Sequence, residues 1–244
     1  MTWTLTRRVS PRLVEVPHTQ STNADLVRAL AAGEEWPHLG ALLTRDQRGG
    51  RGRLGRTWTT APDQALAVSV VLRVPHVPAE RRGWIPLVAG AAMAEAAGEQ
   101  LGRRAGVKWP NDVLVGARKL CGILAEIAAP DAIVLGSGVN TRMTADELPV
   151  PTATSFATEG VDVDEDRLLA TYLGRLDALL TGLVDGSSRE AVRDACSTIG
   201  QAVAVHLPDG SIRRGTAEGL DDEGRLVVDG WAVSAGDIVH LRPA

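Results

Sequence analysis

Two clusters of residues in this chain have side-chain types and spacing that suit chemistry on anions. The first spans residues 44–58, where five arginines and four glycines occur among fifteen positions of a chain with a formal net charge of −4. Glycine lets the backbone approach a ligand closely, and the arginine guanidinium carries forked donors that match phosphate or carboxylate. The glycine and lysine spacing of a P-loop is absent from it. The segment therefore predicts a nucleotide-binding or acyl-phosphate-binding loop, with an RNA-contacting loop and a solvated flexible loop as alternatives.

The second cluster reads Lys108-Trp-Pro-Asn-Asp112 and continues with Arg118-Lys119. The chain has 24 arginines and two lysines, and both lysines fall within this stretch of twelve residues. An ammonium group is a compact point charge that a guanidinium does not imitate, so the clustering indicates a chemical requirement, with chance as the alternative. The turn signature at Pro110 also allows a plain hairpin in which Lys119 lies along an edge strand.

Residues 118–126 alternate in polarity as a strand does. Simple alternation places Lys119, Cys121 and Ile123 on one face and Leu120 and Gly122 on the other. A lysine at the mouth of an otherwise apolar strand is then expected to face a pocket. Further along, residues 136–140 end another expected strand in a glycine-flanked turn, for which ordinary turn chemistry is a sufficient explanation.

The elements that must hold these clusters mix strands and helices irregularly. Hydrophobic patterning predicts strands at 12–16, 40–44, 65–74, 107–115, 120–128 and 132–136, and helices at 22–32, 84–101, 164–183 and 188–198. We expect Thr22 to cap the first helix, with Asp25 as its acidic partner. The pattern favours an α+β fold with helices on one face of a mixed sheet. Residues 45–64 show no apolar periodicity and are expected to form a structureless functional segment.

The chain changes character after Gly200. Short segments separated by turn residues predict five strands, at 202–207, 212–218, 225–228, 231–234 and 237–241. Such regular spacing is typical of a small antiparallel barrel. We therefore expect a domain boundary near residue 199, with domains at 1–199 and 200–244.

The composition excludes several classes of protein. No stretch approaches the roughly 18 apolar residues that would span a membrane, and residues 1–17 lack the apolar run of a signal peptide. Two cysteines do not build a disulfide framework, so buried free thiols are expected. The acidic net charge argues against a general nucleic-acid binder. We expect a cytoplasmic protein with neither nucleic acid nor membrane as a partner.

Taken together, these motifs resemble those of the biotin–protein ligases, the biotin–[acetyl-CoA-carboxylase] ligases. The resemblance rests on five segments in the family's order: Ser21-Thr-Asn23, residues 47–58 with a Gly-Arg-Gly-Arg-x-Gly-Arg core, Lys108-Trp-Pro-Asn-Asp112, residues 118–126, and Gly136-x-Gly-Val-Asn140. It implies a mixed-sheet α+β catalytic domain at 1–199, related to class II aminoacyl-tRNA synthetases and lipoate ligases. It also implies an SH3-like barrel at 200–244.

The resemblance implies roles for individual residues. Biotin would be bound by Ser21, Thr22, Asn23, Gln47, Arg51, Gly52, Arg53, Lys119, Gly122 and Gly138. ATP and the adenylate would be bound by Arg51, Arg53, Arg56, Trp58, Asn111, Lys119 and Asn140. The catalytic residues would be Lys119, Arg53 and Asp112, with Lys119 at the biotin carboxylate and the α-phosphate and Asp112 at the incoming amine. The implied Mg²⁺ would arrive with ATP and not in a cage of protein side chains alone.

The implied activity is the ATP-dependent, AMP-forming ligation of biotin to protein. Biotin would be activated to biotinyl-5′-AMP with release of pyrophosphate, then transferred to a lysine of the biotin carboxyl carrier domain of acetyl-CoA carboxylase or a related carboxylase. A lipoate–protein ligase is the alternative enzyme, and a biotin sensor or repressor is the alternative without catalysis. Only 20 residues precede Ser21, which favours the monofunctional type without an N-terminal DNA-binding domain. A weak or ligand-dependent homodimer is also implied.

Overall fold

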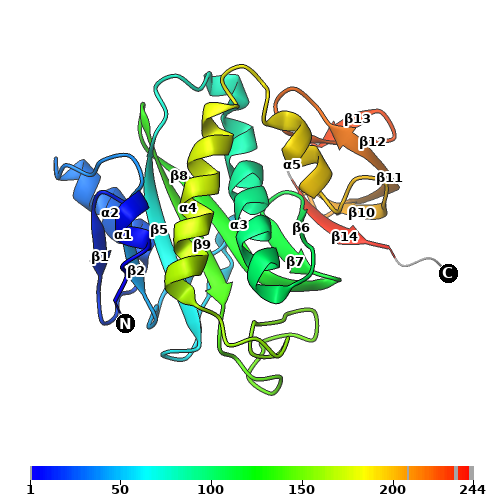
Figure 1. The fold of residues 1–244 in the computed structure, drawn as a ribbon. Coiled ribbons are helices and arrows are strands. Elements are labelled where there is room, and N and C mark those ends of the chain that lie inside the picture. Colours follow the sequence, from blue (N-terminus) through cyan, green and yellow to red (C-terminus); the bar gives the residue numbers. More distant parts are fainter. Residues whose placement is uncertain (1, 208, 234–235, 242–244) are drawn as a thin grey trace.

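A seven-stranded mixed sheet forms the centre of the molecule (Figure 1). The computed structural model describes residues 2–207, 209–233 and 236–241. The strand order is β1-β2-β5-β9-β8-β7-β6, in which β1 and β2 are parallel and every other neighbouring pair is antiparallel. The strands are β1 (Leu13–Glu15), β2 (Gly40–Thr44), β5 (Ala65–Arg73), β9 (Ala132–Asn140), β8 (Arg118–Ala129), β7 (Asp112–Val115) and β6 (Ala105–Lys108). The mixed α+β class predicted from the sequence is confirmed.

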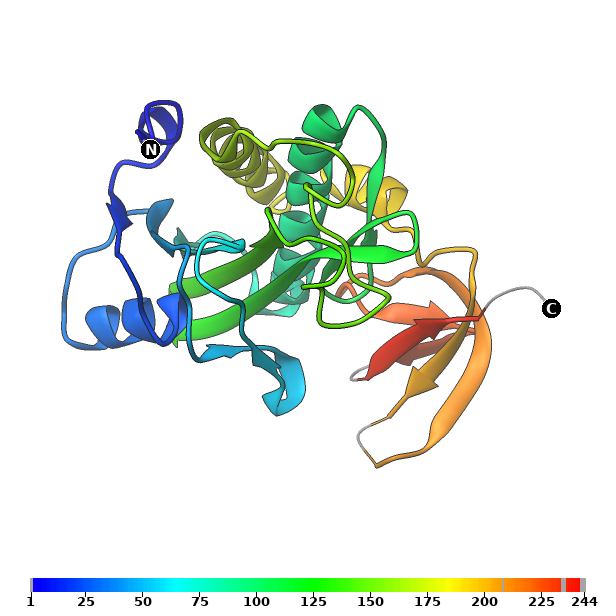
Figure 2. The same ribbon diagram turned by 90° about the horizontal axis from the view of Figure 1, so that it is seen from below.

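Two long helices cover one face of this sheet (Figure 2). The helix α3 (Ile85–Leu101) continues the 3₁₀ helix η2 (Ala79–Trp84), and α4 (Glu165–Thr181) packs beside it. Most buried side chains of α3 are alanines and glycine, whose small size lets the helix lie close to its neighbours. In contrast, α4 is amphipathic and buries leucines and a tyrosine along one stripe. Two short helices, α1 (Thr6–Val9) and α5 (Arg189–Ala195), pack against α4 and α3 respectively.

The helix α2 (Thr22–Ala31) covers the opposite face, which corrects the expectation that the helices share one face (Figure 2). Leu26 of α2 packs in a separate apolar cluster with Leu42, Val71 and Val134. Their neighbours along the strands, such as Leu43, belong to the larger core beneath α3 and α4. Because β2 and β5 are buried on both faces, each face of the sheet needs its own helical cover.

The predicted cap of α2 is wrong by one residue. Ser21 is the N-cap, and its Oγ accepts a hydrogen bond from the Ala24 N–H at 3.3 Å. Thr22 is the first helical residue, so the expected pair of Thr22 and Asp25 does not form a capping box. The reason is tertiary, because the buried Thr22 hydroxyl lies 3.1 Å from Oε1 of Gln47.

Residues 45–64 are more ordered than predicted. The strands β3 (Gly50–Arg51) and β4 (Thr57–Trp58) pair antiparallel around the 3₁₀ helix η1 (Arg53–Gly55). Strands of two residues are too short to produce a hydrophobic alternation, so the sequence carried no periodic signal for this hairpin.

The single strand expected at 107–115 is also wrong. Its residues form β6 and β7, which pair antiparallel on either side of the turn at 109–111. The Trp109–Pro110 peptide bond in this turn is cis. The hairpin that the turn signature at Pro110 allowed is therefore the correct local structure.

The C-terminal part forms a five-stranded antiparallel sheet in the order β13-β12-β11-β10-β14. Its strands are β10 (Ala202–His206), β11 (Ile212–Leu220), β12 (Leu226–Val228), β13 (Trp231–Val233) and β14 (Asp237–His240). These five strands were predicted, although Ser234, expected at the end of β13, lies outside the described residues. Val203 and Leu226 of this sheet belong to the same core cluster as α3. The domain boundary near residue 199 stays a prediction.

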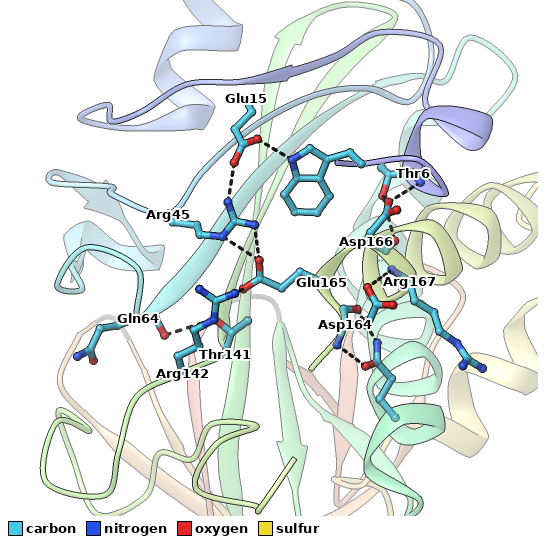
Figure 3. A network of polar contacts seen from close by, with 12 residues as sticks. Thr6, Glu15, Arg45, Gln64, Thr141, Arg142, Asp164, Glu165, Asp166 and Arg167 are labelled. Carbon is cyan, nitrogen blue, oxygen red and sulfur yellow. Dashed lines mark hydrogen bonds and ion pairs between the residues drawn. The ribbon is translucent and has the colours of Figure 1, made fainter. Parts of the chain in front are cut away.

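A polar cluster ties the N-terminal segment to the start of α4 (Figure 3). Asp166 accepts hydrogen bonds from the backbone N–H groups of Leu5 and Thr6, each at 2.8 Å. Beside it, the fully buried Glu165 accepts hydrogen bonds from Nε and Nη2 of Arg45, at 2.8 and 2.6 Å. Since Arg45 begins the 45–64 segment, this cluster also anchors the base of that segment.

The structure also bears on the predictions for the two cysteines and for membrane-spanning segments. Cys121 and Cys196 are free and buried, as expected. Among the residues that the structure describes, no helix has the length and apolar character needed to cross a membrane.

Candidate active site

A cavity of about 310 Å³ opens on the face of the sheet that carries α2. Strands β8 and β9 form its floor, and its walls come from the N-terminus of α2, the 45–64 segment, the β6–β7 turn and β14. Every residue predicted to bind biotin lines this cavity, and so do the predicted Arg56, Trp58, Asn111 and Asp112. The tertiary structure therefore brings together segments that are more than 200 residues apart in the chain.

Three glycines on β8 and β9 form part of the floor of the cavity. A Cβ atom at Gly138 would lie 2.7 Å from the indole of Trp58, and one at Gly136 would collide with Oδ1 of Asn23. On the neighbouring strand, a Cβ atom at Gly122 would lie 3.0 Å from Nζ of Lys119. Glycine at these positions lets other groups lie directly against the backbone of the sheet.

A buried hydrogen-bond network forms the end of the cavity at α2. The backbone N–H of Thr22 donates to Oε1 of Gln47 at 2.9 Å. Oγ of Ser69 lies 2.7 Å from Oγ1 of Thr22 and 2.6 Å from Oδ1 of Asn23. Nδ2 of Asn23 in turn donates to Oε2 of Glu126 at 2.7 Å. No role was predicted for Ser69, although a lone polar residue in an apolar strand was an available signal.

A β-bulge turns Lys119 toward the cavity. The pairing of β8 with β7 shifts between residues 113 and 114, which leaves Leu120 as an extra residue, and both Leu120 and Cys121 are buried in the core. Lys119 therefore shares the face of Gly122, and its Nζ lies 2.6 Å from Oδ1 of Asp112. The predicted alternation was wrong at this position, whereas the expectation of a lysine that faces a pocket is confirmed.

The backbone of Lys119 is held on both sides by the segment that follows β9. Its N–H donates to the carbonyl of Thr152 at 2.7 Å, and its carbonyl accepts from the N–H of Thr154 at 2.8 Å. Asn140 supports this contact, because its Nδ2 donates to the carbonyl of Thr154 at 2.9 Å. Asn140 is not among the residues that line the cavity, so its expected contact with the nucleotide stays a prediction.

The β6–β7 turn adds a second lysine and a link to the arginine-rich segment. Burial lowers the pKa of Lys108, and the charge of Lys119 lowers it further against the opposing effect of Asp112. Burial likewise lowers the pKa of Arg53, whose Nη1 lies 3.4 Å from Oδ1 of Asn111. Both cations are therefore partly removed from water, and the charge of Asp112 does not offset the effect of burial on their pKa values.

Two arginines of the 45–64 segment form ion pairs at the edge of the cavity. Nη2 of Arg51 lies 3.1 Å from Oε1 of Glu126, and Arg56 pairs with Asp237 of β14. The contribution of β14, which also includes Ile238 and Val239, was missed by the sequence analysis. Nothing in the local sequence of a short barrel strand signals that it closes a distant cavity.

The cavity offers no obvious set of ligands for a resident metal ion. Within the described ranges, no group of three or more histidine, cysteine or acidic side chains is arranged to hold one. The carboxylate of Asp112 is paired with Lys119. The Mg²⁺ expected to arrive with ATP stays a prediction.

Comparison with known proteins shows the family of this chain. Residues 15–140 match the model of the biotin/lipoate A/B protein ligase family, and residues 198–241 match the biotin protein ligase C terminal domain. The chain belongs to the biotin/lipoate A/B protein ligase family. The biotin–[acetyl-CoA-carboxylase] ligase of Mycobacterium tuberculosis is 39% identical over 237 residues, which cover 93% of this chain and 88% of the relative. The ligase of the same name from Paracoccus denitrificans is 31% identical over 230 residues, or 88% and 92% of the two chains.

Solved structures of biotin protein ligases share the fold of this family member. The biotin protein ligase from Aquifex aeolicus in complex with biotin and ATP superposes with a TM-score of 0.77 and 26% identity. The match covers 95% of this chain and 99% of that one. Together with the relatives above, it confirms the predicted fold class and the prediction that the chain is a ligase.

Proposed function

We propose that this ligase activates biotin with ATP and transfers the biotinyl group to a lysine of a biotin carboxyl carrier domain. One observation carries the proposal, namely the collection of cationic side chains over a glycine floor: Arg51, Arg53, Arg56, Lys108 and Lys119. A carboxylate and a triphosphate are both anions, so their reaction requires positive charge where they meet. The names of the relatives support biotin as the acid.

The polar end of the cavity suits the neutral ring system of biotin. Ser21, Thr22, Asn23 and Gln47 offer hydroxyl, amide and backbone groups in a network whose geometry is held by buried hydrogen bonds. The ureido group of biotin both donates and accepts hydrogen bonds, so it is matched by such a mixed set of partners. Its carboxylate would then extend along the floor toward Lys119.

In the first step, a carboxylate oxygen of biotin attacks the α-phosphorus of ATP. The bond between the α-phosphorus and its bridging oxygen breaks, and pyrophosphate leaves. Lys119 binds the biotin carboxylate and the α-phosphate in this proposal, and the guanidinium of Arg53 shares the charge that develops on the phosphoryl oxygens. Magnesium supplied with ATP would neutralise the charge of the pyrophosphate.

The mixed anhydride must then be kept from water until an acceptor arrives. The 45–64 segment contributes the covering wall, and its ion pairs from Arg51 to Glu126 and from Arg56 to Asp237 would stabilise that wall. The indole of Trp58 lies against Gly138, where it would stack near the adenine ring.

In the second step, the amine nitrogen of the acceptor lysine attacks the acyl carbon of biotinyl-5′-AMP. The bond between the acyl carbon and the phosphate oxygen breaks, AMP leaves and the amine loses a proton. Asp112 is the carboxylate next to Lys119, and we assign it the role of orienting the amine or accepting that proton.

The first experiment is ATP–pyrophosphate exchange with the purified protein, in which biotin is compared with lipoate. Exchange that depends on biotin supports the proposal, whereas exchange with lipoate alone keeps the chemistry and overturns the substrate. No exchange with either acid from folded protein would favour a sensor. The cytoplasmic location, the carrier-domain partner and the weak or ligand-dependent homodimer stay predictions. Sedimentation with and without biotinyl-5′-AMP tests the last of them.

A further inference from the structure

Two tryptophans outside the C-terminal sheet hold the same turn of that sheet. Nε1 of Trp84 donates to the carbonyl of Asp222 at 3.0 Å, and Nε1 of Trp109 donates to the carbonyl of Gly224 at 3.0 Å. Both indoles are buried. The turn thus receives two hydrogen bonds of the same kind, two residues apart, from two different elements.

The turn between β11 and β12 is internally rigid, so its carbonyls are fixed acceptors. Oδ1 of Asp221 accepts from the N–H groups of Glu223 and Arg225, each at 2.9 Å, and its Oδ2 accepts from Nε of Arg225 at 2.7 Å. Gly224 has a φ of 80°, a left-handed conformation that favours glycine. A Cβ atom there would lie 3.2 Å from Trp84, so the turn also fits closely against that ring.

Trp109 differs from Trp84 in what it is connected to. Trp84 immediately precedes α3 and is not among the residues that line the cavity. Trp109 stands in the β6–β7 turn and itself lines the cavity, together with its neighbours Lys108, Asn111 and Asp112. A displacement of the Trp109 ring would therefore be transmitted to the side chains of the proposed active site.

The backbone of Trp109 is also bound by residues near the C-terminal sheet. Its N–H donates to Oγ1 of Thr198 at 3.0 Å, and this hydroxyl lies 3.0 Å from Nε2 of His240 on β14. Thr198 is fully buried. Ring and backbone of one residue are thus bound by two separate contacts that originate at or beyond residue 198.

We propose that Trp109 is a positioning residue, through which the β11–β12 turn and Thr198 set the orientation of the β6–β7 turn in the active site. The C-terminal sheet then acts on the reaction by holding Lys108, Asn111 and Asp112 in place, in addition to closing the cavity with β14. This inference rests on the proposed function for its catalytic consequence, while the ordering of the turn is a property of the chain itself.

The test compares Trp109→Phe with Trp84→Phe, since each removes one indole N–H from a carbonyl of the same turn. We expect Trp109→Phe to lower kcat for pyrophosphate exchange about tenfold, since even a misplacement of about 1 Å can cost on the order of 10²-fold. KM for biotin should stay the same, because the biotin end lies on other elements. The two variants should lower the melting temperature by similar amounts, because each loses one hydrogen bond to the same turn. Trp84→Phe should leave kcat unchanged. Equal effects of the two variants on kcat would overturn the proposal.

Hydrogen–deuterium exchange provides a readout that does not depend on the reaction. Amides of residues 107–114 should exchange faster in Trp109→Phe and at the wild-type rate in Trp84→Phe. The proposal is overturned if these amides exchange at the same rate in the two variants. This outcome is independent of whether the wild-type protein shows biotin-dependent ATP–pyrophosphate exchange. Absence of that activity with the expected protection pattern would instead contradict the proposed function alone.

A second pair of variants applies if Trp109→Phe does not fold. Thr198→Val removes the acceptor of the Trp109 N–H at nearly constant volume, and Thr198→Ser retains the hydroxyl. We expect the valine variant to lower kcat and to loosen residues 107–114, and the serine variant to restore both. Identical behaviour of the two variants would count against the proposal.

Discussion

Two clusters in this molecule combine cationic side chains with carboxylates, and they differ in charge balance and in burial. The cluster at the start of α4 sets Arg45 and Arg142 against Glu15 and Glu165 (Figure 3). Glu165 is fully buried, and the Arg45 side chain is 15% exposed. The cavity instead combines five cationic residues with three carboxylates, those of Asp112, Asp237 and, at its edge, Glu126, and the Lys119 side chain is 40% exposed.

The pKa shifts point in opposite directions in the two clusters. Burial alone would lower the pKa of Arg45, but hydrogen bonds and charges from Glu165 and Glu15 outweigh burial and raise it. In the cavity, burial prevails and lowers the pKa of Lys108 and of Arg53. In the buried cluster, protein carboxylates therefore satisfy the charge of Arg45, whereas the cavity holds an excess of partly accessible cations that is available to an anionic ligand.

The largest expected effect is on the cation that faces the cavity floor. Lys119→Ala should reduce adenylate formation by roughly 10²–10³-fold, which is the scale for removal of one preorganised charge donor. The melting temperature should change little, because the side chain contributes to the site and not to the core. Pyrophosphate exchange and calorimetry measure the two quantities. A loss below tenfold would contradict the assigned role.

The buried cluster should respond in the opposite way. Glu165→Gln leaves Arg45 without its buried counter-charge, so we expect the free energy of unfolding to fall by about 3 kcal/mol, the lower end for breaking a buried pair. KM for biotin should be unchanged in the folded fraction. Urea unfolding measures the effect, with Glu95→Gln as the control because the ion pair of Glu95 with Arg175 is exposed. Similar losses of unfolding free energy in the two variants would show that the buried cluster contributes no more to stability than an exposed ion pair.

The arginine-rich segment allows a comparison within one loop. Arg53→Gly should release biotinyl-5′-AMP about tenfold faster, the scale of one lost hydrogen bond to a charged group, and should increase labelling of bystander lysines. Arg48→Gly is the matched control, because Arg48 pairs with Asp46 and does not line the cavity. Adenylate release is followed after a single turnover. Retention as tight as in the wild-type protein would refute the covering role of Arg53.

The smallest expected effect concerns Cys121, on the face of β8 that is turned toward the core and away from the cavity. Burial raises the pKa of the Cys121 thiol to about 12, so only about one molecule in ten thousand carries the thiolate at pH 8. We therefore expect iodoacetamide to leave Cys121 unmodified in the folded protein at pH 8 and to modify it in urea. Peptide mass spectrometry reads both states. Fast alkylation of the native protein would show that the core face of β8 is open.

Much of the site could be predicted because its residues occur in short motifs with an obvious chemical type. The glycines and arginines of residues 47–58 and the turn around Pro110 are local signals, and the structure brings both to one cavity. Ser69 and Asp237 were missed, since each acts through a partner that is distant in sequence. The residues that share a face with Lys119 were also predicted wrongly, because the β-bulge at Leu120 depends on how β8 pairs with β7.

The sequence by itself determined most of the helices and strands, the anion-binding residue types of the motifs and the mixed α+β class. These properties follow from residue type and near-neighbour periodicity, which are written along the chain. Only the tertiary structure decided that α2 covers the second face, that Ser21 caps it, that β14 lines the cavity, and that the β11–β12 turn binds Trp109. Such contacts join residues up to 181 positions apart, as for Arg56 and Asp237, and they are selected by packing of the whole core and not by any local pattern.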